Sequence, residues 1–446
     1  MRAWFPPDVP FAPRRAPFFY GWVVVAAATA GVLFSIPGQT MGVSVFTDSL
    51  LDATGLGRLS FSNAYLLGTL ASALLLPRAG VWIDRRGVRV SAMTAALALG
   101  IVVAVLSQTD RVVRAAASAT ALSASTVAFV VLTFLFVNLR FFGQGVLTLA
   151  SNTMLARWFE RRRGIAAATS GLFVAFGFGY APQLFDAWIE RAGWRGAWLE
   201  IALLEVVGMG LLAWLFYREN PASCGLNPDG ATDSLEKSDP PVEATASTRA
   251  EALRTRAFWV LTLSLALQGA VLTGITLHIV DIGTEAGLER TRAVSLFLPM
   301  AVFSTATGAL VGVLADRTSM RSLVLSLLFW EAVGFAASAH VGDPAGFWLA
   351  SICLGVAGGH FSVLSVVGHP RFFGTRHLGS IAAASTSVVV VGSALGPSAL
   401  ALSRATLGSY QPALHAAALL PLVVGACAIV PLHPRDVPPA AREARE

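Results

Sequence analysis

The sequence predicts an all-α membrane protein with twelve transmembrane helices in two pseudo-symmetric six-helix bundles. Three observations predict this fold class. Apolar stretches of about 20 residues, the length that a helix needs to cross a bilayer, recur along the whole chain. Only 13% of the 446 residues are charged, too few to cover the surfaces of a water-soluble chain of this length. A Gly-x-x-x-Asp-Arg motif occurs twice, at residues 80–85 and 312–317, roughly half the chain apart.

The apolar stretches give the number and order of the helices. They are continuous and do not alternate with a period of two, which indicates helices rather than a β-barrel. The fourth stretch is long, but it holds no strong turn signal, so we interpret it as one helix. The predicted spans are 18–41, 60–83, 89–108, 121–154, 164–188, 196–217, 257–281, 292–314, 321–340, 345–368, 379–403 and 411–432.

The arginines indicate the orientation in the membrane. If the N-terminus lies in the cytoplasm, the segments on that side hold about 22 of the 32 lysines and arginines, and the opposite loops hold about 8. We therefore expect a multi-pass protein of the cell membrane (inner or plasma membrane) with both termini cytoplasmic. Because the basic residues lie in short loops between apolar stretches, topology explains the net charge of +6, and we expect no nucleic-acid partner.

One long polar stretch divides the chain. It is rich in serine, contains a Pro-Pro pair and carries mixed charge, which is typical of a flexible linker. A second duplicated pattern, an arginine followed by two aromatic residues, occurs at Arg157 and again at Arg371. The predicted segments are a cytoplasmic N-terminal tail (1–17), an N-terminal bundle (18–217), a cytoplasmic linker (218–255), a C-terminal bundle (256–432) and a cytoplasmic C-terminal tail (433–446).

The sequence carries no signature of an enzyme. The three cysteines are widely spaced and give neither a disulfide framework nor a zinc site. No metal-binding His-Glu-x-x-His, phosphate-binding glycine loop or nucleophile elbow is present. We expect no catalytic activity, no cofactor and no metal.

The motifs together resemble the major facilitator superfamily. After the second predicted helix, Gly80, Asp84, Arg85, Gly87 and Arg89 form the pattern Gly-x-x-x-Asp-Arg-x-Gly-x-Arg. The stretch 140–145 in the fourth helix is similar to the Arg-x-x-x-Gly region of that superfamily. The resemblance covers residues 18–432 and implies a transporter in which two bundles rock around a central site.

Local features resemble the monocarboxylate and oxalate:formate antiporter-like branch of the superfamily. They imply a small, monocarboxylate-like organic anion as substrate. These features are Tyr20-Gly21-Trp22, Arg157-Trp158-Phe159, the stretch 225–230 and Phe258-Trp259.

The duplicated loops are candidates for conformational gating. Asp84 could accept hydrogen bonds from a helix N-terminus or pair with an arginine such as Arg157. The resemblance implies a contact between the second and eleventh helices that holds the outward-facing state. The simpler alternative is a basic loop with one stray acid. The candidate gating residues are Gly80, Asp84, Arg85, Gly87, Arg89, Gly312, Asp316, Arg317 and Arg321.

Arg140 is the most informative single residue. It lies in the middle of the fourth predicted helix, where a charge costs at least ~2.5 kcal/mol and needs a water-filled cavity or a partner. Gln144, Thr148 and Asn152 follow at four-residue intervals and form a polar stripe with it. A planar guanidinium can hold a carboxylate at two points, so we expect Arg140, Gln144 and Asn152 to contact an anionic substrate. The alternatives are a structural arginine and a proton relay.

Further substrate-contact candidates are Gln39 at the Pro-Gly break of the first helix, Gln268 and His278 in the seventh, and His360 in the tenth. His278 and Asp281 are spaced to share a helix face and could relay protons. The alternative is an interfacial pair that faces water. His360 could equally form an ordinary bond between helices. The acids Glu200, Glu205 and Glu331 lie within predicted helices, and the sequence assigns them no role.

The sequence therefore predicts a secondary transporter for a small organic anion, with proton coupling or anion exchange. We expect it to act as a monomer in the lipid bilayer. The first alternative is an efflux transporter for drugs or neutral metabolites. The second is a non-transporting membrane sensor, which the short polar linker disfavours because it leaves no room for an output domain.

Overall fold

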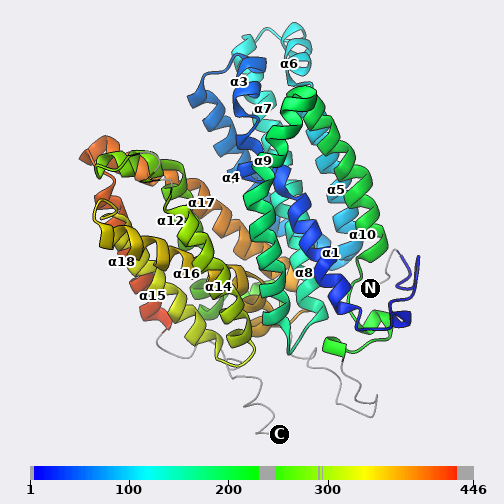
Figure 1. Cartoon of the computed structure of the whole chain (residues 1–446). Coiled ribbons are helices and arrows are strands. Elements are labelled where there is room, and N and C mark those ends of the chain that lie inside the picture. Colours follow the sequence, from blue (N-terminus) through cyan, green and yellow to red (C-terminus); the bar gives the residue numbers. More distant parts are fainter. Residues whose placement is uncertain (1–4, 231–246, 290–291, 294, 429–446) are drawn as a thin grey trace. The chain divides into compact units, whose positions relative to one another are not determined.

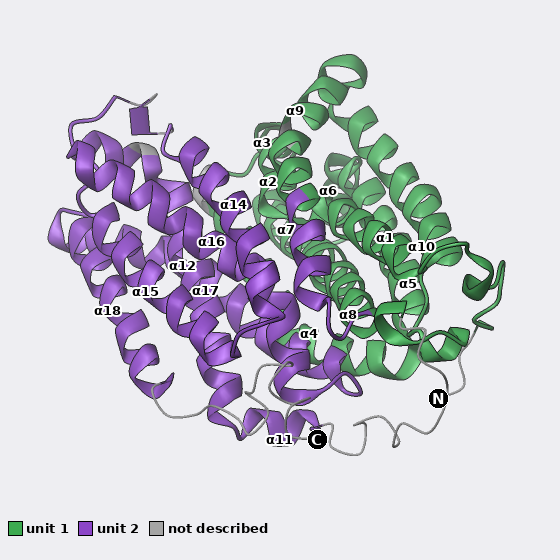
Figure 2. Ribbon diagram, turned by 60° about the horizontal axis from the view of Figure 1, so that its bottom comes forward, with its two compact units in different colours: residues 1–158, 173–232 green, residues 159–172, 233–446 purple. Residues whose placement is uncertain are grey.

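The computed structural model describes residues 5–230, 247–289, 292–293 and 295–428, and all regular elements in these ranges are helical (Figure 1). The predicted all-α membrane fold class is thereby confirmed. The contacts divide the chain into two compact units (Figure 2). Unit 1 comprises Met1–Trp158 and Phe173–Thr232, and unit 2 comprises Phe159–Leu172 and Asp233–Glu446. The boundary falls inside one helix, α9, whose first turns belong to unit 2.

Unit 1 combines long apolar helices with short connecting ones. Two of its helices contain π-helical turns, η3 (Phe141–Leu147) and η4 (Leu204–Met209). Its elements are α1 (Gly21–Phe34), η2 (Ile36–Gly38), α2 (Thr40–Ser44), α3 (Thr47–Thr54), α4 (Arg58–Arg86), α5 (Val88–Leu106), α6 (Thr109–Ser118), α7 (Ala124–Arg140), α8 (Thr148–Trp158), most of α9 (Arg163–Leu203) and α10 (Gly210–Phe216).

Unit 2 is more regular. Besides the first turns of α9, it contains one short helix and six long ones in the described residues. These are α11 (Arg249–Leu253), α12 (Arg256–Glu285), α14 (Phe297–Ala315), α15 (Met320–Ser338), α16 (Pro344–Phe373), α17 (Leu378–Leu407) and α18 (Gln411–Ala428).

Ten helices in the described residues are long and apolar enough to cross a membrane, whereas twelve were predicted. The first predicted helix is broken, because α1 ends after 14 residues and η2 contains Pro37. The fifth and sixth form one run, Arg163–Phe216, in which Gly193 alone is non-helical with φ of 70°. The fourth is confirmed as one continuous run, Ala124–Trp158.

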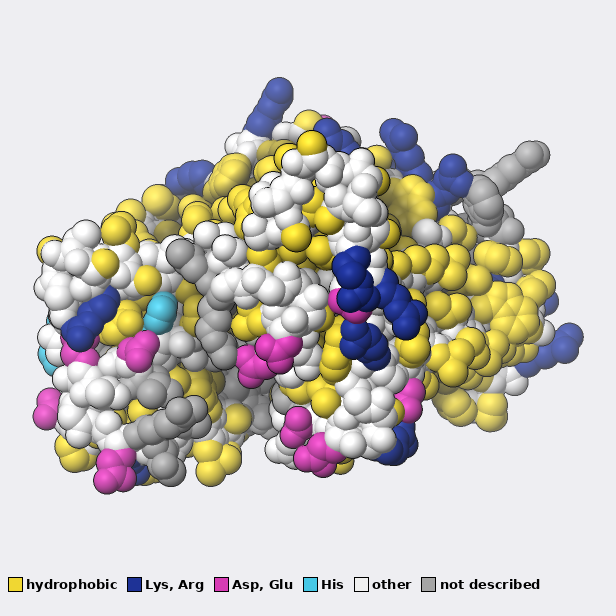
Figure 3. All heavy atoms as spheres, turned by 90° about the horizontal axis from the view of Figure 1, so that it is seen from above, with side chains coloured by type: hydrophobic (Ala, Val, Ile, Leu, Met, Phe, Trp, Pro, Cys, Tyr) yellow, Lys and Arg dark blue, Asp and Glu magenta, His cyan; other side chains and the backbone are white. Residues whose placement is uncertain are grey.

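Large apolar side chains are exposed along the long helices. Leu74, Phe176 and Leu298 are each about 70% exposed, as expected for side chains that face lipid. Figure 3 looks onto the end at the top of Figure 1, where charged side chains gather on the face and hydrophobic side chains cover much of the rim. The molecule is a multi-pass membrane protein.

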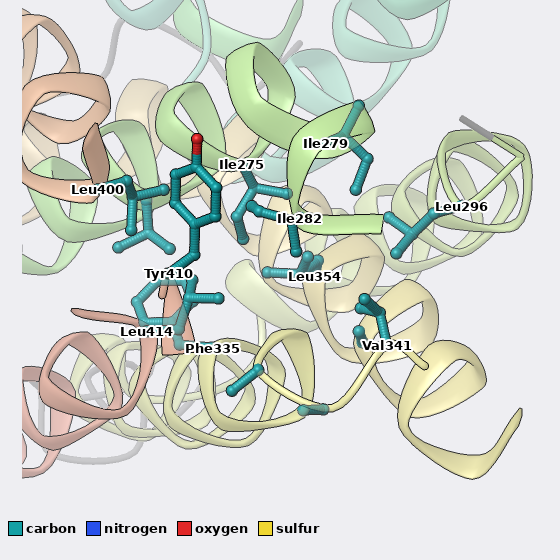
Figure 4. Packing of buried hydrophobic residues seen from close by; sticks show 14 of the residues in the cluster. Ile275, Ile279, Ile282, Leu296, Phe335, Val341, Leu354, Leu400, Tyr410 and Leu414 are labelled. Carbon is teal, nitrogen blue, oxygen red and sulfur yellow. The ribbon is translucent and has the colours of Figure 1, made fainter. Parts of the chain in front are cut away.

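A cluster of buried hydrophobic residues fixes one end of unit 2. Ile282 of α12, Phe335 of α15, Leu354 of α16 and Leu414 of α18 belong to it (Figure 4). These four helices come together there because each contributes an apolar side chain that is at most 5% exposed. The cluster makes this end of unit 2 a rigid support for the residues around it.

Both ends of the predicted linker are packed against helices. In unit 1, Arg218 is 2% exposed, and its carbonyl oxygen accepts a hydrogen bond from Trp158 Nε1 at 3.0 Å. In unit 2, the Ser247 amide donates to the Phe373 carbonyl oxygen at 3.0 Å, just before α11. The flexible linker that we predicted is therefore at most the middle of that stretch. That middle, 231–246, and the predicted C-terminal tail, 433–446, lie outside the described residues.

Candidate functional site

A buried arginine lies where two irregular helices of unit 1 meet. Arg140 is the last residue of α7 and is 3% exposed. Its Nη1 donates a hydrogen bond to the Gly38 carbonyl oxygen at 3.0 Å, and its Cζ lies 5.3 Å from the centroid of the Tyr65 ring. Its Nε has no partner, and no carboxylate pairs with it, among the described residues. The cation is thus held in place without being neutralised.

The backbone is irregular on both sides of this contact. The first helix breaks at η2, and the π-helical turn η3 follows Arg140 directly. Gly38 and Gly143 meet there so closely that a Cβ on Gly143 would lie 2.7 Å from the Gly38 Cα. Only glycines allow this approach. Broken helices and π turns recur at ligand sites because they release backbone groups from the helical hydrogen-bond ladder.

Polar side chains surround the break. Ser35 Oγ accepts hydrogen bonds from Thr148 Oγ1 at 3.0 Å and from Gln39 Nε2 at 3.1 Å. The Tyr65 hydroxyl donates to Thr40 Oγ1 at 3.0 Å. These bonds link the first helix to α4 and α8 and fix the orientation of the Tyr65 ring below Arg140.

Two of the predicted contact residues are near this break and one is farther along. Gln39 belongs to the polar group just described. The Gln144 backbone nitrogen lies 3.0 Å from the position of a Cβ on Gly38, so Gln144 is adjacent to the break. Asn152 lies two turns beyond Gln144 in α8. The side chains of Gln144 and Asn152 are half-buried and have no hydrogen-bond partner within the described ranges, which leaves both amides able to bind a ligand.

The candidates in unit 2 lie on unbroken helices. Gln268 of α12 is 1% exposed, and neither of its amide atoms has a partner in the described part of the chain. His360 of α16 is 4% exposed, and its Nδ1 is 2.9 Å from the Val356 carbonyl oxygen of the same helix. His360 is thus partly satisfied within its own helix.

His278 and Asp281 form a separate polar group near the end of α12. His278 Nε2 lies 3.1 Å from the Pro397 carbonyl oxygen of α17, and its Nδ1 lies 3.9 Å from Asp281 Oδ2. Because a carbonyl oxygen can only accept, Nε2 carries a proton. Nδ1 then faces the carboxylate, an arrangement that suits the doubly protonated ring. Tyr410, whose ring centroid is 5.3 Å from that of His278, packs beside the pair.

The first copy of the duplicated loop is held by an ion-pair network in unit 1. Asp84 Oδ1 accepts a hydrogen bond from Arg157 Nη2 at 2.9 Å, and both side chains are 8% exposed. Arg157 also pairs with Glu219. Glu219 Oε2 in turn accepts a hydrogen bond from the Val88 amide at 2.8 Å, at the first turn of α5. Of the two partners that the sequence allowed for Asp84, the arginine is therefore present.

The other residues of this loop have different surroundings. Gly87 has φ of 88°, which favours glycine, and it ends α4. Arg89 Nη2 donates to the Val9 carbonyl oxygen at 2.8 Å and also bonds to the Trp214 carbonyl, so Arg89 fixes the N-terminal segment. Arg85 is exposed, and Gly80 is buried in α4.

The second copy caps a helix in unit 2. Asp316 Oδ1 accepts a hydrogen bond from the Gly164 amide at 2.9 Å, and Oδ2 accepts one from the Ile165 amide at 3.3 Å, at the start of α9. Burial raises the pKa of Asp316 to about 6, against the two amide bonds and the charges of Arg163 and Arg371, which lower it.

The remaining residues of the second loop support this contact. A Cβ on Gly312 would lie 2.8 Å from the Gly164 carbonyl oxygen, so the two helices touch through glycines. Arg321 Nε donates to the Ala428 carbonyl oxygen at 2.9 Å and ties α15 to α18. Arg317 is exposed.

The three intramembrane acids differ from one another. Glu200 is paired with Arg191. Glu205 is 1% exposed and Glu331 is 0% exposed; Glu205 Oε2 and both Glu331 oxygens have no partner among the described residues. Carboxyl groups in such surroundings are expected to be protonated.

Sequence analysis missed three residues of these groups, namely Ser35, Tyr65 and Glu219. Ser35 could have been found from its place two residues before Pro37 at the helix break. Glu219 could have been found as the acid that directly follows the sixth apolar stretch, where an adjacent arginine loop needs a counter-charge. Nothing in the sequence around Tyr65 distinguishes it from an ordinary core aromatic.

Comparison with known families defines the class of protein. The model of the Major Facilitator Superfamily matches residues 23–397, and the chain belongs to this family. The family consists of transporters rather than enzymes, so the chain is a membrane transporter of the secondary type, which confirms the general class that the duplicated motifs predicted. No curated protein matches the chain in sequence.

Several solved structures share the fold. The *E. coli* fucose:proton symporter FucP superposes with a TM-score of 0.65 at 13% identity, covering 92% of this chain and 98% of that chain. The human organic anion transporter MFSD10 (TETRAN) gives 0.60 at 15% identity, covering 93% and 100%. A bacterial homologue of the iron transporter ferroportin gives 0.64 at 16% identity, covering 91% and 98%. At these identities the likeness shows the fold.

Proposed function

We propose that this transporter moves a small organic anion by alternating access, with proton coupling or anion exchange. The observation that carries the proposal is Arg140, a buried guanidinium with no carboxylate partner among the described residues. A charge inside the membrane is costly unless an opposite charge or water compensates it. An anionic substrate would supply that charge when it binds, which makes Arg140 a binding residue rather than a purely structural one.

The surroundings of Arg140 favour a carboxylate. One Nη is used by the Gly38 carbonyl oxygen, which fixes the plane of the guanidinium, and Nε is left without a partner. A planar, oriented fork of this kind suits a planar carboxylate. The amides of Gln39 and Gln144 can donate to the same ligand, and Asn152 can contact its far end. This chemistry agrees with the resemblance to the monocarboxylate and oxalate:formate branch.

Unit 2 supplies the weaker candidates. We propose that Gln268 and His360 contribute polar contacts to the same substrate. His278 and Asp281 are the proposed proton relay, because the second ring nitrogen of His278 faces a carboxylate. In anion exchange this pair would have only a structural role.

The conformational cycle follows from the duplicated loops. We propose that the bundles 18–217 and 256–432 rock against each other, joined by the linker 218–255. Asp84 and Asp316, with their neighbouring glycines and arginines, control the rate of this movement. The protein would lie in the cell membrane as a monomer with both termini cytoplasmic, as the distribution of arginines favours.

The first experiment measures thermal stabilisation of the purified protein by a panel of small carboxylates, with neutral and cationic compounds included. A ligand that binds the folded state raises the apparent melting temperature. We expect carboxylates to raise it, and Arg140→Ala to remove that rise. Arg140→Lys, which keeps the charge without the fork, should retain a reduced rise. Arg114→Ala is the matched control, since Arg114 is an exposed arginine of the same unit.

The outcomes separate the two transport hypotheses. A carboxylate shift that disappears in Arg140→Ala and persists in Arg114→Ala supports the anion site and selects the compound for transport assays. Shifts caused only by neutral or cationic compounds, or a carboxylate shift that Arg140→Ala leaves unchanged, would replace the anion proposal with efflux of drugs or neutral metabolites.

A further inference from the structure

Two histidines from different helices of unit 2 converge at one end of the bundle. His340 follows α15, and His415 lies in the second turn of α18. Their Nε2 atoms are 3.2 Å apart, and their ring centroids are 5.2 Å apart. Both residues are exposed to solvent. They are far along the chain from each other and play no part in the proposed transport site.

The backbone beneath the pair is fixed by packing. Ala339 and Val341, on either side of His340, are 3% and 2% exposed, and Leu414, which precedes His415, is fully buried. All three belong to the hydrophobic cluster of unit 2, in which Figure 4 shows Val341 and Leu414 among the packed side chains. The two imidazoles therefore extend from a rigid base, and bringing them together costs little conformational entropy.

The distance between the rings matches the bite of a metal ion. Bonds from zinc to imidazole nitrogen are about 2.0–2.1 Å long, so two such ligands at angles of about 90–110° lie roughly 2.9–3.4 Å apart. The observed 3.2 Å lies in this interval. Neither Nδ1 has a hydrogen-bond partner among the described residues. Each Nδ1 can therefore carry the ring proton and leave both Nε2 lone pairs for the ion.

We propose that His340 and His415 form a two-histidine site for a borderline divalent transition-metal ion, of which Zn²⁺ and Cu²⁺ are the preferred examples. Imidazole nitrogen favours these ions over Mg²⁺ and Ca²⁺, and affinity rises towards Cu²⁺ along the first row. No group of three or more potential ligands is present in the described residues, so water completes the coordination. The bound ion links α15 to α18.

A plain hydrogen bond between the rings is the competing explanation. In that case one Nε2 carries the proton, and the exposed bond adds little to stability because water competes for both partners. The two explanations differ in their response to added metal. Metal binding needs both rings neutral, so it should weaken as the pH falls below about 6.5, the ordinary pKa of histidine.

The test uses full-length protein purified without a histidine tag. All samples carry Cys427→Ser, because Cys427 is an exposed free thiol that would also take up metal. The melting temperature is measured against ZnCl₂ at pH 7.5 and pH 5.5, and Cu²⁺ binding is followed by electron paramagnetic resonance. His340→Ala, His415→Ala and the double variant are compared with His377→Ala, a histidine elsewhere in unit 2.

We expect ZnCl₂ to raise the melting temperature at pH 7.5 and not at pH 5.5, and the Cu²⁺ spectrum to show coupling to two nitrogens. Each single variant should weaken binding by at least about tenfold, since even outer-shell changes commonly cost that much. The double variant should lose no more than the sum for independent ligands, whereas His377→Ala should bind as the parent does. No metal-dependent shift in the parent, or a shift that survives either substitution, would overturn the proposal.

Discussion

The corresponding helices of the two units differ in regularity. In unit 1 the first helix is broken at η2 and the fourth contains the π turn η3, and Arg140 lies where they meet. In unit 2 the helices in the same places, α12 and α16, each run for 30 residues without a break. Breaks expose backbone carbonyls and allow them to hold a charged side chain, whereas a regular helix uses its carbonyls internally. We infer that unit 1 carries the specific contacts and unit 2 provides a firmer wall.

The duplicated motifs allow this comparison to be made residue by residue. Leu354 precedes Arg371 by the same number of residues as Arg140 precedes Arg157. Leu354 is 1% exposed and belongs to the hydrophobic cluster of unit 2. Chain order thus pairs a buried arginine in one half with a buried leucine in the other, and this pair suggests the most direct way to break the asymmetry.

Arg140→Leu should have the largest effect, because it gives unit 1 the side chain found in unit 2. We expect transport at low substrate concentration to fall by at least about 30-fold, since losing one partner of a buried charge pair costs about 2 kcal/mol or more. Stability without ligand should be unchanged or higher, because a packed apolar side chain replaces an uncompensated charge. Uptake assays and melting temperatures measure the two effects.

His360→Gln is the control for this prediction. His360 already bonds within its own helix, so we expect less than about a threefold loss of transport. A loss in His360→Gln as large as that in Arg140→Leu would remove the proposed asymmetry between the units.

Asp84→Asn should have the next largest effect. It removes the charge that Arg157 balances in a pair with side chains only 8% exposed, although Arg157 keeps Glu219. We expect the maximal transport rate to change by about tenfold while substrate affinity stays nearly constant, because the loop is a proposed gate and not a contact site. Rates and affinities are measured by uptake over a substrate series. A large loss of affinity with a normal maximal rate would contradict the gating role.

Gly143→Ala tests the close contact at the helix break. Its Cβ would lie 2.7 Å from the Gly38 Cα, and overpacking of this kind costs about 1–3 kcal/mol. We expect a lower melting temperature and weaker substrate binding. Gly179→Ala in α9 is the matched control, since nothing lies within 4 Å of its Cβ position. It should leave stability unchanged or raise it by about 0.5–1 kcal/mol. Equal behaviour of the two variants would show that the glycine contact is not needed.

Sequence reasoning predicted the class of fold because lipid imposes strong constraints. Length and hydrophobicity identify a spanning helix, and the duplicated Gly-x-x-x-Asp-Arg motif identifies two halves. The same reasoning placed Arg140 and Gln39 near a break, since Pro37 and Gly38 interrupt a helix wherever they occur.

Other features depend on contacts between distant segments, which periodicity does not encode. The π turn at Phe141–Leu147 keeps the helical pattern of the sequence, so nothing local marked it. Arg89 belongs to a predicted gating motif, yet it binds the N-terminal segment through Val9. Glu219 was taken as part of a linker, although it completes the network around Arg157. In each case the partner is far away in the chain.

The two loop acids provide the smallest and most specific prediction. Asp84 balances an arginine, whereas Asp316 caps α9, and burial raises the pKa of Asp316 to about 6. A carboxyl whose pKa is higher in the folded state than in the unfolded state stabilises the fold most when it is protonated. That contribution is complete below about pH 4 and is lost as the pH rises through 6. Asp316→Asn cannot titrate, so it should lack this dependence.

The melting temperature of the parent, relative to that of Asp316→Asn, should therefore fall between about pH 4 and pH 6 and remain level above that range. The hydrogen bonds from the Gly164 and Ile165 amides act in the opposite direction, because they favour the ionised form. If the parent instead gains stability over the variant as the pH rises, helix capping outweighs burial at Asp316. The second loop would then act as Asp84 does, through a permanently charged carboxylate, and the contrast between the two copies would disappear.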